Sequence, residues 1–333
     1  MRSWSHIRGF TLIELMVSMV LGLVIVGGAT GVILANKQSY RTNEALSQVQ
    51  EGARTAFELL ARDVREAGIT GCDSSGRVAN VLDTTSGTVW WQTWYGIAGY
   101  DGTEVDPAVA VGTSTAERVT GTDAIILQGI QGTGLSVETH DPVGASIKLN
   151  ALSASIQQGD VMMVCNFDHA AMFQVSGYNS STVTLLHRTG SLTPGNCSQG
   201  LGYPTLCSSG GNAYAFGPNS QVGRMAASAW YVGNNNRATE GGRSLYRRRM
   251  GAAAAVITEE VVAGVTNMEL TYREQGVNEF RDAENVVNWA NVNAVMVVLT
   301  VQSVDQRVST DLVNDGRLER RFTNIVTLRN RVP

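Results

Sequence analysis

The sequence is short of charge, proline and lysine, and each shortage narrows the class of protein. Charged residues make up 16% of the 333 positions, and there are only 6 prolines against 36 glycines. Such a composition indicates many turns and few rigid linkers, in one large domain or two small ones. The net charge is −4, with arginine supplying most of the positive charge, so we expect no electrostatic attraction for nucleic acid.

The sequence also lacks the C-x-x-C spacing of zinc and redox sites. Its four cysteines are Cys72, Cys165, Cys197 and Cys207. An even number in an exported chain favours two disulfides. Of the possible pairings, the spacing favours Cys197 with Cys207 in a local loop and Cys72 with Cys165 across a long one. Buried free thiols are the alternative.

No catalytic or cofactor motif is present. There is no nucleophile elbow, zinc-protease helix or phosphate-binding glycine loop. The histidines have no partners at metal or triad spacing and are scattered: His6, His140, His169 and His187. An acidic group around a turn offers oxygens of the kind that calcium takes, although a solvated turn explains it better: Asp311, Asp315 and Glu319. We therefore expect no catalytic residue, no metal and no cofactor, and predict that the chain is not an enzyme.

One long stretch has no charge at all. It runs from Leu15 to Asn36, and the next charged residue is Lys37. A helix of about 20 apolar residues, at 1.5 Å of rise each, crosses a bilayer. Residues 1–9 contain Arg2 and Arg8 and no acid. Basic residues before the stretch place the N-terminus in the cytoplasm, so the remainder is exported. No small-residue cleavage site follows the apolar run, so an ordinary secretory signal is not indicated.

The residues before this stretch carry a resemblance. The segment GFTLIE, residues 9–14, resembles the class III signal of type IV prepilins. The resemblance implies that a prepilin peptidase cuts after Gly9, methylates the new N-terminal Phe10 and leaves the helix in the mature protein. Glu14 is then expected to pair with the α-amino group of a neighbouring subunit, because an unpaired charge in an apolar bundle is heavily penalised. Such a pair would fix the stagger between subunits.

Two glycines within the apolar stretch allow two interpretations. Gly27 and Gly31 form a G-x-x-x-G pair, which lets helices approach each other closely. Each glycine also weakens a helix by roughly 1 kcal/mol relative to alanine. Both interpretations stay open.

The helical period continues beyond Lys37. Apolar residues recur at steps of three and four: Leu46, Val49, Ala53, Ala56, Phe57, Leu60, Val64 and Ala67. Gly68 is a natural C-cap. The stripe is too short for a free coiled coil, so we expect it to pack on a sheet.

Beyond Gly68 the pattern predicts a β-rich head. Short apolar runs bounded by turn residues are typical of strands: Ala124–Leu127, Ile147–Leu149, Val161–Val164, Met172–Val175, Thr182–Leu186, Ser228–Val232, Ser244–Tyr246, Met268–Arg273, Ala294–Gln302 and Phe322–Leu328. We expect Met172–Val175 and Thr182–Leu186 to form a hairpin around Gly177–Ser181. The turn-rich stretch 196–211 is interpreted as an insertion.

Two unusual side-chain clusters lie in this region. Trp90 and Trp91 would point to opposite faces of a strand, which predicts one buried ring and one exposed ring that could anchor a partner. The triplet Arg247–Arg249 could bind an anion or an acidic partner, but a solvated strand edge is the preferred interpretation.

Three distal stretches resemble the PilW family of type IV pilus assembly proteins, which are minor pilins: residues 61–68, 261–273 and 322–329. The resemblance implies an α+β, type IV pilin-like fold, with a long N-terminal α-helix packed on an antiparallel β-sheet head. The expected divisions are a leader (1–9), a transmembrane and filament-core helix (10–36), an amphipathic helix (37–68) and a periplasmic β-rich domain (69–333).

The resemblance also implies a function and partners. A minor pilin is anchored once in the inner membrane, primes pilus assembly and then lies in the pilus, at its tip. Its partners would be the prepilin peptidase, other minor and major pilins and the inner-membrane assembly platform. A J-type pseudopilin of type II secretion is the nearest alternative, and a membrane-anchored periplasmic enzyme or receptor is a more distant one.

Overall fold

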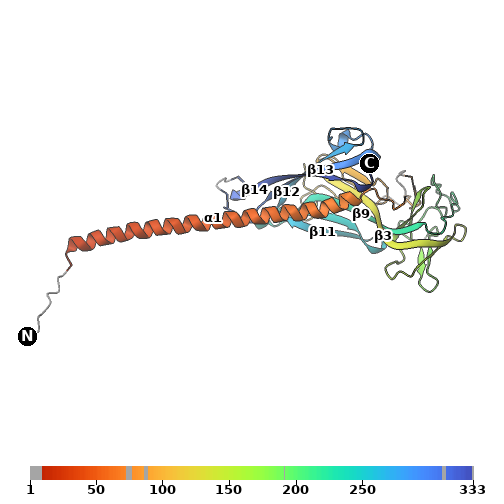
Figure 1. Cartoon of the computed structure of the whole chain (residues 1–333), viewed down its shortest axis with the longest axis horizontal. Helices are drawn as coiled ribbons and strands as arrows, with labels where there is room; N and C mark the ends of the chain where they lie inside the picture. The colour runs from red at the N-terminus through yellow and green to blue at the C-terminus, as the bar shows by residue number, and fades with distance from the viewer. Residues whose placement is uncertain (1–9, 73–76, 86–88, 191, 310–312, 332–333) are drawn as a thin grey trace, which may run out of the picture.

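A single long helix carries a β-rich head at its C-terminal end. The computed structural model describes residues 10–72, 77–85, 89–190, 192–309 and 313–331. Helix α1 (Leu12–Glu66) has 55 residues, which span about 80 Å at 1.5 Å each. Its first half extends away from the head, and its second half lies along it (Figure 1). The predicted α+β class, with a long N-terminal helix packed on a β-rich head, is confirmed.

The two halves of α1 differ in what surrounds them. Apolar residues of the first half are exposed, whereas from Ala45 onward one face is buried: Ala45, Val49, Ala53, Ala56, Leu60, Ala61, Asp63 and Val64. This is the predicted stripe, although Leu46 and Phe57 are only partly buried. The helix ends at Ala67, whose backbone is extended, with ψ of 141°. Gly68 then adopts a left-handed conformation, with φ of +75°, and donates its N–H to the carbonyl of Gln128.

The larger of two sheets in the head has 11 strands. Its centre is the antiparallel pair β3 (Ala124–Asp141) and β9 (Gln221–Asn234). The main path runs β1-β6-β5-β9-β3-β4-β8-β7, with β2 joined to β3, β10 to β9 and β11 to β10. The remaining strands are β1 (Val78–Asn80), β2 (Ile97–Tyr100), β4 (Ser146–Leu149), β5 (Val161–Cys165), β6 (Ala170–Gln174), β7 (Gly177–Asn179), β8 (Thr184–Leu186), β10 (Arg243–Met250) and β11 (Val256–Ala263). Of these ladders, β1 with β6 is the parallel one.

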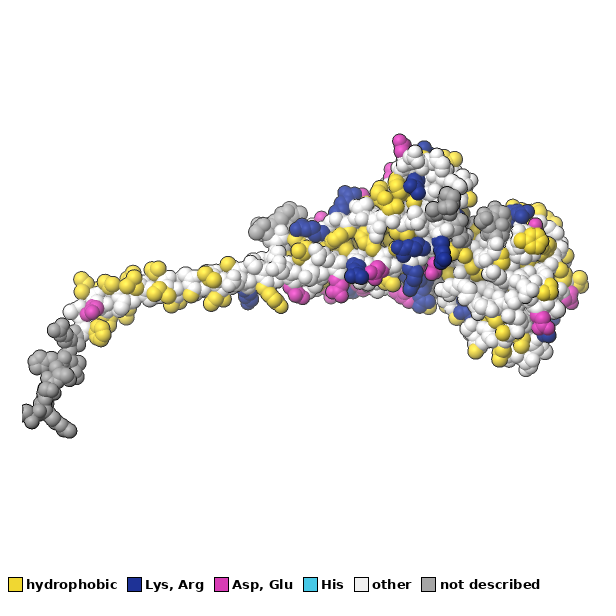
Figure 2. Space-filling model, in the orientation of Figure 1, with side chains coloured by type: hydrophobic (Ala, Val, Ile, Leu, Met, Phe, Trp, Pro, Cys, Tyr) yellow, Lys and Arg dark blue, Asp and Glu magenta, His cyan; other side chains and the backbone are white. Residues whose placement is uncertain are grey.

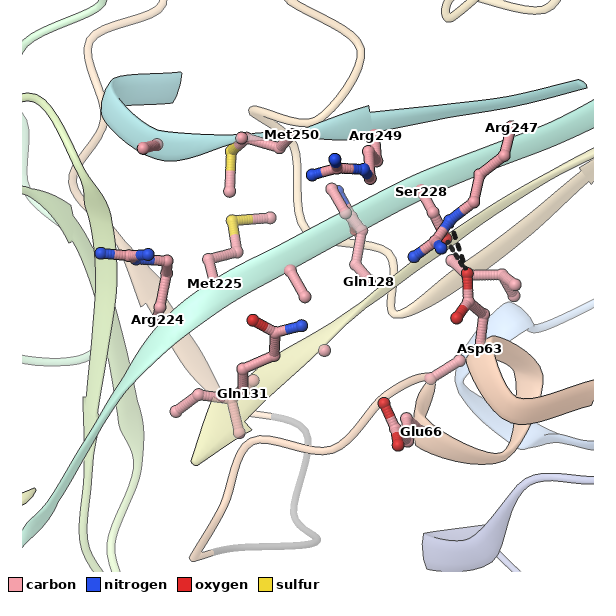
Figure 3. Close-up of a pocket in the computed structure, with 18 of the residues that line it drawn as sticks. Asp63, Glu66, Gln128, Gln131, Arg224, Met225, Ser228, Arg247, Arg249 and Met250 are labelled. Atoms are coloured by element: carbon pink, nitrogen blue, oxygen red, sulfur yellow. Dashed lines mark hydrogen bonds and ion pairs between the residues drawn. The ribbon is translucent and has the colours of Figure 1, made fainter. Parts of the chain in front are cut away.

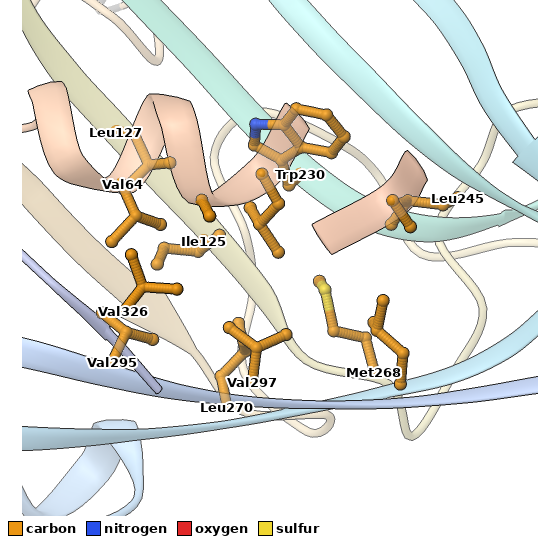
Figure 4. Close-up of a cluster of buried hydrophobic side chains, with 14 of the residues drawn as sticks. Val64, Ile125, Leu127, Trp230, Leu245, Met268, Leu270, Val295, Val297 and Val326 are labelled. Atoms are coloured by element: carbon orange, nitrogen blue, oxygen red, sulfur yellow. The ribbon is translucent and has the colours of Figure 1, made fainter. Parts of the chain in front are cut away.

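The smaller sheet is antiparallel, in the order β12-β13-β14. Its strands are β12 (Val265–Glu274), β13 (Val292–Gln302) and β14 (Glu319–Thr327). Side chains of both sheets converge on the buried face of α1 around Val64 (Figure 4), among them Ile125, Trp230, Leu270, Val297 and Val326. The main core therefore lies where the helix meets both sheets. Six short 3-10 helices occupy connections: Ala238–Glu240, Ala252–Ala254, Ala283–Asn285, Trp289–Asn291, Val313–Gly316 and Arg329–Arg331.

The predicted hairpin between Met172–Val175 and Thr182–Leu186 is wrong. Gly177–Asn179 is itself strand β7 and pairs with β8. The Asn179 carboxamide shapes the turn by accepting from the N–H groups of Ser181 and Thr182. Strand β6 pairs with β5 and β1 instead, because its five residues are all buried and require neighbours on both edges.

The two adjacent tryptophans are both buried, so the predicted exposed ring is wrong. Trp90 is 5% exposed and Trp91 is 2% exposed. They lie in a turn, not in a strand, so the alternation of side chains across a sheet does not apply to them. Both rings belong to a second core that includes Ala124, Ile126 and Tyr231 of the central strands.

The arginine triplet lies inside the larger sheet, so the predicted strand edge is also wrong. Strand β10 is paired on one side with β9 and on the other with β11. Arg249 forms an ion pair with Glu259 of β11, with 2.7 Å between nitrogen and oxygen. Arg248 donates to the carbonyl of Ala108 at 2.6 Å. The error follows from β11, which the sequence pattern did not reveal.

A buried carboxylate holds the end of α1 against the larger sheet. Asp63 is 8% exposed, and its Oδ2 accepts from the Trp230 indole N–H at 3.0 Å and the Ser228 hydroxyl at 3.1 Å. The Nε of Arg247 lies 3.1 Å from the same oxygen, and its guanidinium lies over the Trp230 ring. Figure 3 shows Asp63 reaching Ser228 and Arg247 from the last turn of the helix. One carboxylate thus joins α1, β9 and β10.

Two disulfides connect parts of the head. Cys72, just after the helix, is bonded to Cys165 at the end of β5, and Cys197 is bonded to Cys207. These are the pairs that the spacing favours. The second bond lies within the stretch 196–211, which contains no helix or strand.

The two disulfides should differ in their contribution to stability. The cysteines are 93 residues apart in one pair and 10 in the other. Because a longer loop restrains the unfolded chain more, Cys72→Ser should lower the free energy of unfolding by about 4–5 kcal/mol and Cys197→Ser by about 2–3 kcal/mol. Urea unfolding of the full chain in detergent measures both values. Peptide mapping without reductant checks the pairing, and Cys72 joined to Cys197 or Cys207 would contradict it.

Removal of the Asp63 carboxylate should loosen the helix from the head. Asp63→Ala leaves the Trp230 N–H and the Arg247 guanidinium buried without this acceptor, so the free energy of unfolding should fall by about 3–5 kcal/mol. Arg62→Ala is the matched control. Arg62 is exposed and forms a weak ion pair with the other carboxylate oxygen, at 3.7 Å, so the free energy of unfolding should change by less than about 1 kcal/mol. Equal losses in the two variants would show that Asp63 does not anchor the helix.

Candidate assembly site

The N-terminal end of α1 carries one carboxylate on an apolar surface. Glu14 is the only charged residue from Phe10 to Asn36. The hydroxyl of Thr11 caps the helix by accepting from the Glu14 N–H at 3.3 Å, and it lies 3.5 Å from the Glu14 carboxylate. Phe10, Leu12 and Ile13 around it are all more than two-thirds exposed, at 85%, 78% and 72%. Across the described residues, no cation forms an ion pair with Glu14.

The predicted processing residues are described only in part. Phe10 is exposed and precedes the Thr11 cap. Gly9 lies outside the described residues, as do Arg2, His6 and Arg8. The structure therefore gives the surroundings of Phe10 and Glu14 but not those of the bond to be cut.

The free part of α1 has the length and apolar composition of a membrane-crossing helix. Space-filling atoms show apolar side chains around this segment (Figure 2). A Cβ added at Gly27 or Gly31 would meet nothing within 4 Å, so another helix could approach there. The single chain does not separate this interpretation from a locally weakened helix.

The free and docked parts of α1 meet where three hydrogen bonds, here called the clasp, join the helix to the head. Three side chains on the helix donate to backbone carbonyls of the segment after β13: Gln38 to Arg307 at 3.2 Å, Arg41 to Gln306 at 3.3 Å and Thr42 to Val308 at 2.7 Å. Below this clasp, buried Arg317 donates to the carbonyls of Ser303, Ala238 and Thr239. The contacts between α1 and this segment of the head therefore begin at Gln38, two residues after the charge-free stretch ends at Asn36.

A polar cavity of about 440 Å³ opens where α1 ends (Figure 3). Its lining includes Glu66, Gln131, Arg224, Arg249 and Met250. Two arginines of the lining are paired within the chain: Arg224 with Asp160 at 2.6 Å, and Arg249 with Glu259. Ser228 also lines the cavity, and its hydroxyl donates to Asp63, so this serine takes part in the contact that holds the end of α1.

The structure brings together two histidines that the sequence left apart. The Nε2 atoms of His140 and His187 are 3.1 Å apart, and Nδ1 of His140 accepts from the Phe216 N–H at 3.0 Å. Burial lowers the pKa of His140 to about 4 and that of His187 to about 3, so both rings are neutral near pH 7. The pair ties the end of β3 to the segment after β8. No spacing rule could find it, because 47 residues separate the two histidines.

Of the acidic group considered for calcium, the structure describes Asp315 and Glu319. Asp315 has a left-handed backbone, with φ of +60°, and its carboxylate lies 3.4 Å from the Gln306 amide nitrogen. Glu319 begins β14, and Asp311 lies outside the described residues. Within the ranges that the structure describes, no three His, Cys, Asp or Glu residues lie together as a metal ion would require.

Comparison with known protein families identifies the N-terminal segment. Residues 4–30 match the family model described as the prokaryotic N-terminal methylation motif. Comparisons with curated proteins and with solved structures gave no match. The motif is one of structural, pilin-like proteins, and it implies cleavage by a prepilin peptidase and association with pilins and a membrane. The match covers Gly9, Phe10, Glu14 and α1 as far as residue 30, and it supports a type IV pilin-like protein.

Proposed function

We propose that this chain is a minor type IV pilin of the PilW type, which primes pilus assembly and lies at the pilus tip. Residues 1–9 would be removed, and residues 10–36 would span the inner membrane and later lie in the filament core. Residues 37–68 connect this span to a periplasmic head formed by residues 69–333. The partners would be other minor pilins, the major pilin and the inner-membrane assembly platform.

The observation that carries this proposal is Glu14. It is a lone carboxylate on an exposed apolar helix, within the matched methylation motif. Cleavage after Gly9 would create an α-amino group on Phe10, a cation in equally apolar surroundings. Each charge needs a partner in a low-dielectric bundle, and a neighbouring subunit supplies the opposite one. Membrane anchoring alone would not require this carboxylate, but assembly would.

The PilW assignment is supported by how its three resembling stretches pack. Leu60 and Val64 lie in or beside the first, Met268 and Leu270 in the second, and Val326 and Leu328 in the third, and all belong to the main core. If PilW proteins have this core in common, stretches that are far apart in sequence would each resemble the family, because together they build the core.

A J-type pseudopilin of type II secretion would have the same N-terminal segment. Deletion of the gene separates the two functions: loss of pili supports the proposal, and loss of protein secretion with normal pili supports the alternative. A membrane-anchored periplasmic enzyme or receptor would show neither loss.

The first prediction concerns processing. Mass spectrometry of the mature protein should find methylated Phe10 at the N-terminus. Gly9→Val should abolish cleavage, because a branched side chain crowds the peptidase at the cut. Gly22→Val is the matched control: a Cβ there meets nothing within 4 Å, so this variant should mature normally. Normal maturation of Gly9→Val would rule out prepilin processing.

The second prediction concerns assembly. Glu14→Ala should insert and be cleaved as usual, but its incorporation into pili or a priming complex should fall by at least about tenfold, equivalent to about 1.4 kcal/mol. Glu44→Ala removes an exposed acid of α1 beyond the apolar stretch and should change incorporation little. Immunoblots of sheared pili and pilus counts measure both variants. Wild-type pilus numbers in Glu14→Ala would mean that the carboxylate has no role in assembly.

A further inference from the structure

The outer edge of β14 is unpaired. This strand ends the order β12-β13-β14. Among the described residues, no backbone group outside the β13 ladder hydrogen-bonds to Glu319–Thr327. The opposite edge of the sheet is used: the Met268 carbonyl accepts from the Asp123 N–H at 3.0 Å, and the Leu270 N–H donates to the Asp123 carboxylate at 2.7 Å. One edge of the smaller sheet is therefore complemented within the chain and the other is not.

The open edge lacks the features that usually prevent pairing with another strand. Strand β14 has 9 residues and an unbroken register against β13. It contains no proline, lysine or glycine, and its charges are confined to Glu319–Arg321. The remaining part, FTNIVT, is uncharged and rich in residues with high β-propensity. Proteins normally protect such an edge with a charge, a proline or a bulge, because it templates strand addition.

The edges of the larger sheet are protected in these ways. Strands β1 and β7 have only 3 residues each. Strand β11 is longer, but its ladder with β10 contains a bulge, and it carries Glu259 and Glu260 in ion pairs with Arg249 and Arg237. Strand β2, which pairs only with β3, has 4 residues. Among these edge strands, β14 is the long one whose ladder contains no bulge.

We propose that the β14 edge is a docking site for an extended strand of a neighbouring, different pilin-like subunit. A row of alternating N–H and C=O groups is complemented by another extended backbone, and this mode of recognition needs no preformed pocket. The identity of the neighbouring subunit rests on the proposed function. Strand β14 packs beside α1 where the free helix leaves the head (Figure 1). A subunit whose helix runs parallel to α1 in the same bundle would bring its own head next to this edge.

The side chains of β14 define the chemistry of the partner strand. Ile325 is 53% exposed, so the facing segment should be apolar or β-branched along FTNIVT. Arg321 is paired with Glu269, whereas Arg320 is exposed and, among the described residues, bonds only to the carbonyl of Glu319. We therefore expect a partner strand with about six uncharged residues opposite FTNIVT and, next to them, an acidic residue opposite Arg320.

A second copy of this chain fits the edge less well. Antiparallel self-pairing around a twofold axis would reverse one α1 relative to the other, since β14 and α1 lie side by side in Figure 1, and the two helices could not enter one membrane in the same direction. Parallel self-pairing in register would place Arg320 and Arg321 beside their own copies, and adjacent like charges are destabilising.

Hydrogen–deuterium exchange tests the backbone pairing directly. The full chain would be compared in detergent, alone, with the same chain in the complex isolated from pilus-forming cells. Amides of residues 322–327 should exchange at least about tenfold more slowly in the complex, and amides of β11 should not change. Unchanged exchange at 322–327 in an isolated complex would overturn the proposal. If no complex forms and Phe10 is not methylated, the proposed function itself has failed.

Two exposed substitutions complete the test. Ile325→Lys places a charge on the open edge and should reduce recovery of the complex by at least about tenfold, with normal processing and thermal stability. Val287→Lys is the control, because Val287 is 83% exposed and outside β14, and its recovery should match the wild type. Equal recovery of both variants would contradict the proposal. Co-isolation of two differently tagged copies without other pilins would replace it with self-pairing.

Discussion

The burial of one face of α1 between two sheets is the interaction on which the rest of the molecule depends. Most of the buried residues on this face are small, and the close packing they allow is evident at Gly52, where a Cβ would lie 3.2 Å from a methyl group of Val262. The buried charge on the face, Asp63, is tolerated because it accepts two hydrogen bonds from β9 and lies beside the Arg247 guanidinium of β10. The helix is thus a core element of the head.

The same helix serves two environments. Its free half exposes apolar residues on every side, and its docked half exposes polar residues on one side only. No proline interrupts it between Leu12 and Glu66. The clasp at Gln38–Thr42 and the carboxylate of Asp63 hold the docked half at both ends. The position of Glu14 relative to the head is therefore set by one continuous helix, as an assembly built on helix stagger requires.

In two loops away from the main core, side-chain amides make hydrogen bonds that backbone groups make within the sheets. The Gln128 carboxamide accepts from the Tyr95 N–H and donates to the carbonyls of Trp91 and Thr93, which holds the tryptophan turn against β3. Gln174 and Asn196 hold the loop around Cys197 in the same way. Buried hydrogen bonds therefore help to position both loops, together with the buried Trp90 and Trp91 rings in one and the Cys197–Cys207 disulfide in the other.

The sequence by itself determined the features that depend on local pattern: the charge-free span with its lone Glu14, the buried stripe of α1, the Gly68 stop and most of the apolar strands. Tertiary structure decided which strands are neighbours, since an apolar period shows which face is buried but not what covers it. Strand β11 placed the arginine triplet inside a sheet, an irregular turn buried both Trp90 and Trp91, and the strand order β3-β4-β8 brought His140 to His187. Each of these outcomes depends on long-range pairing, whose free energy is distributed over many contacts and leaves no local signature in the chain.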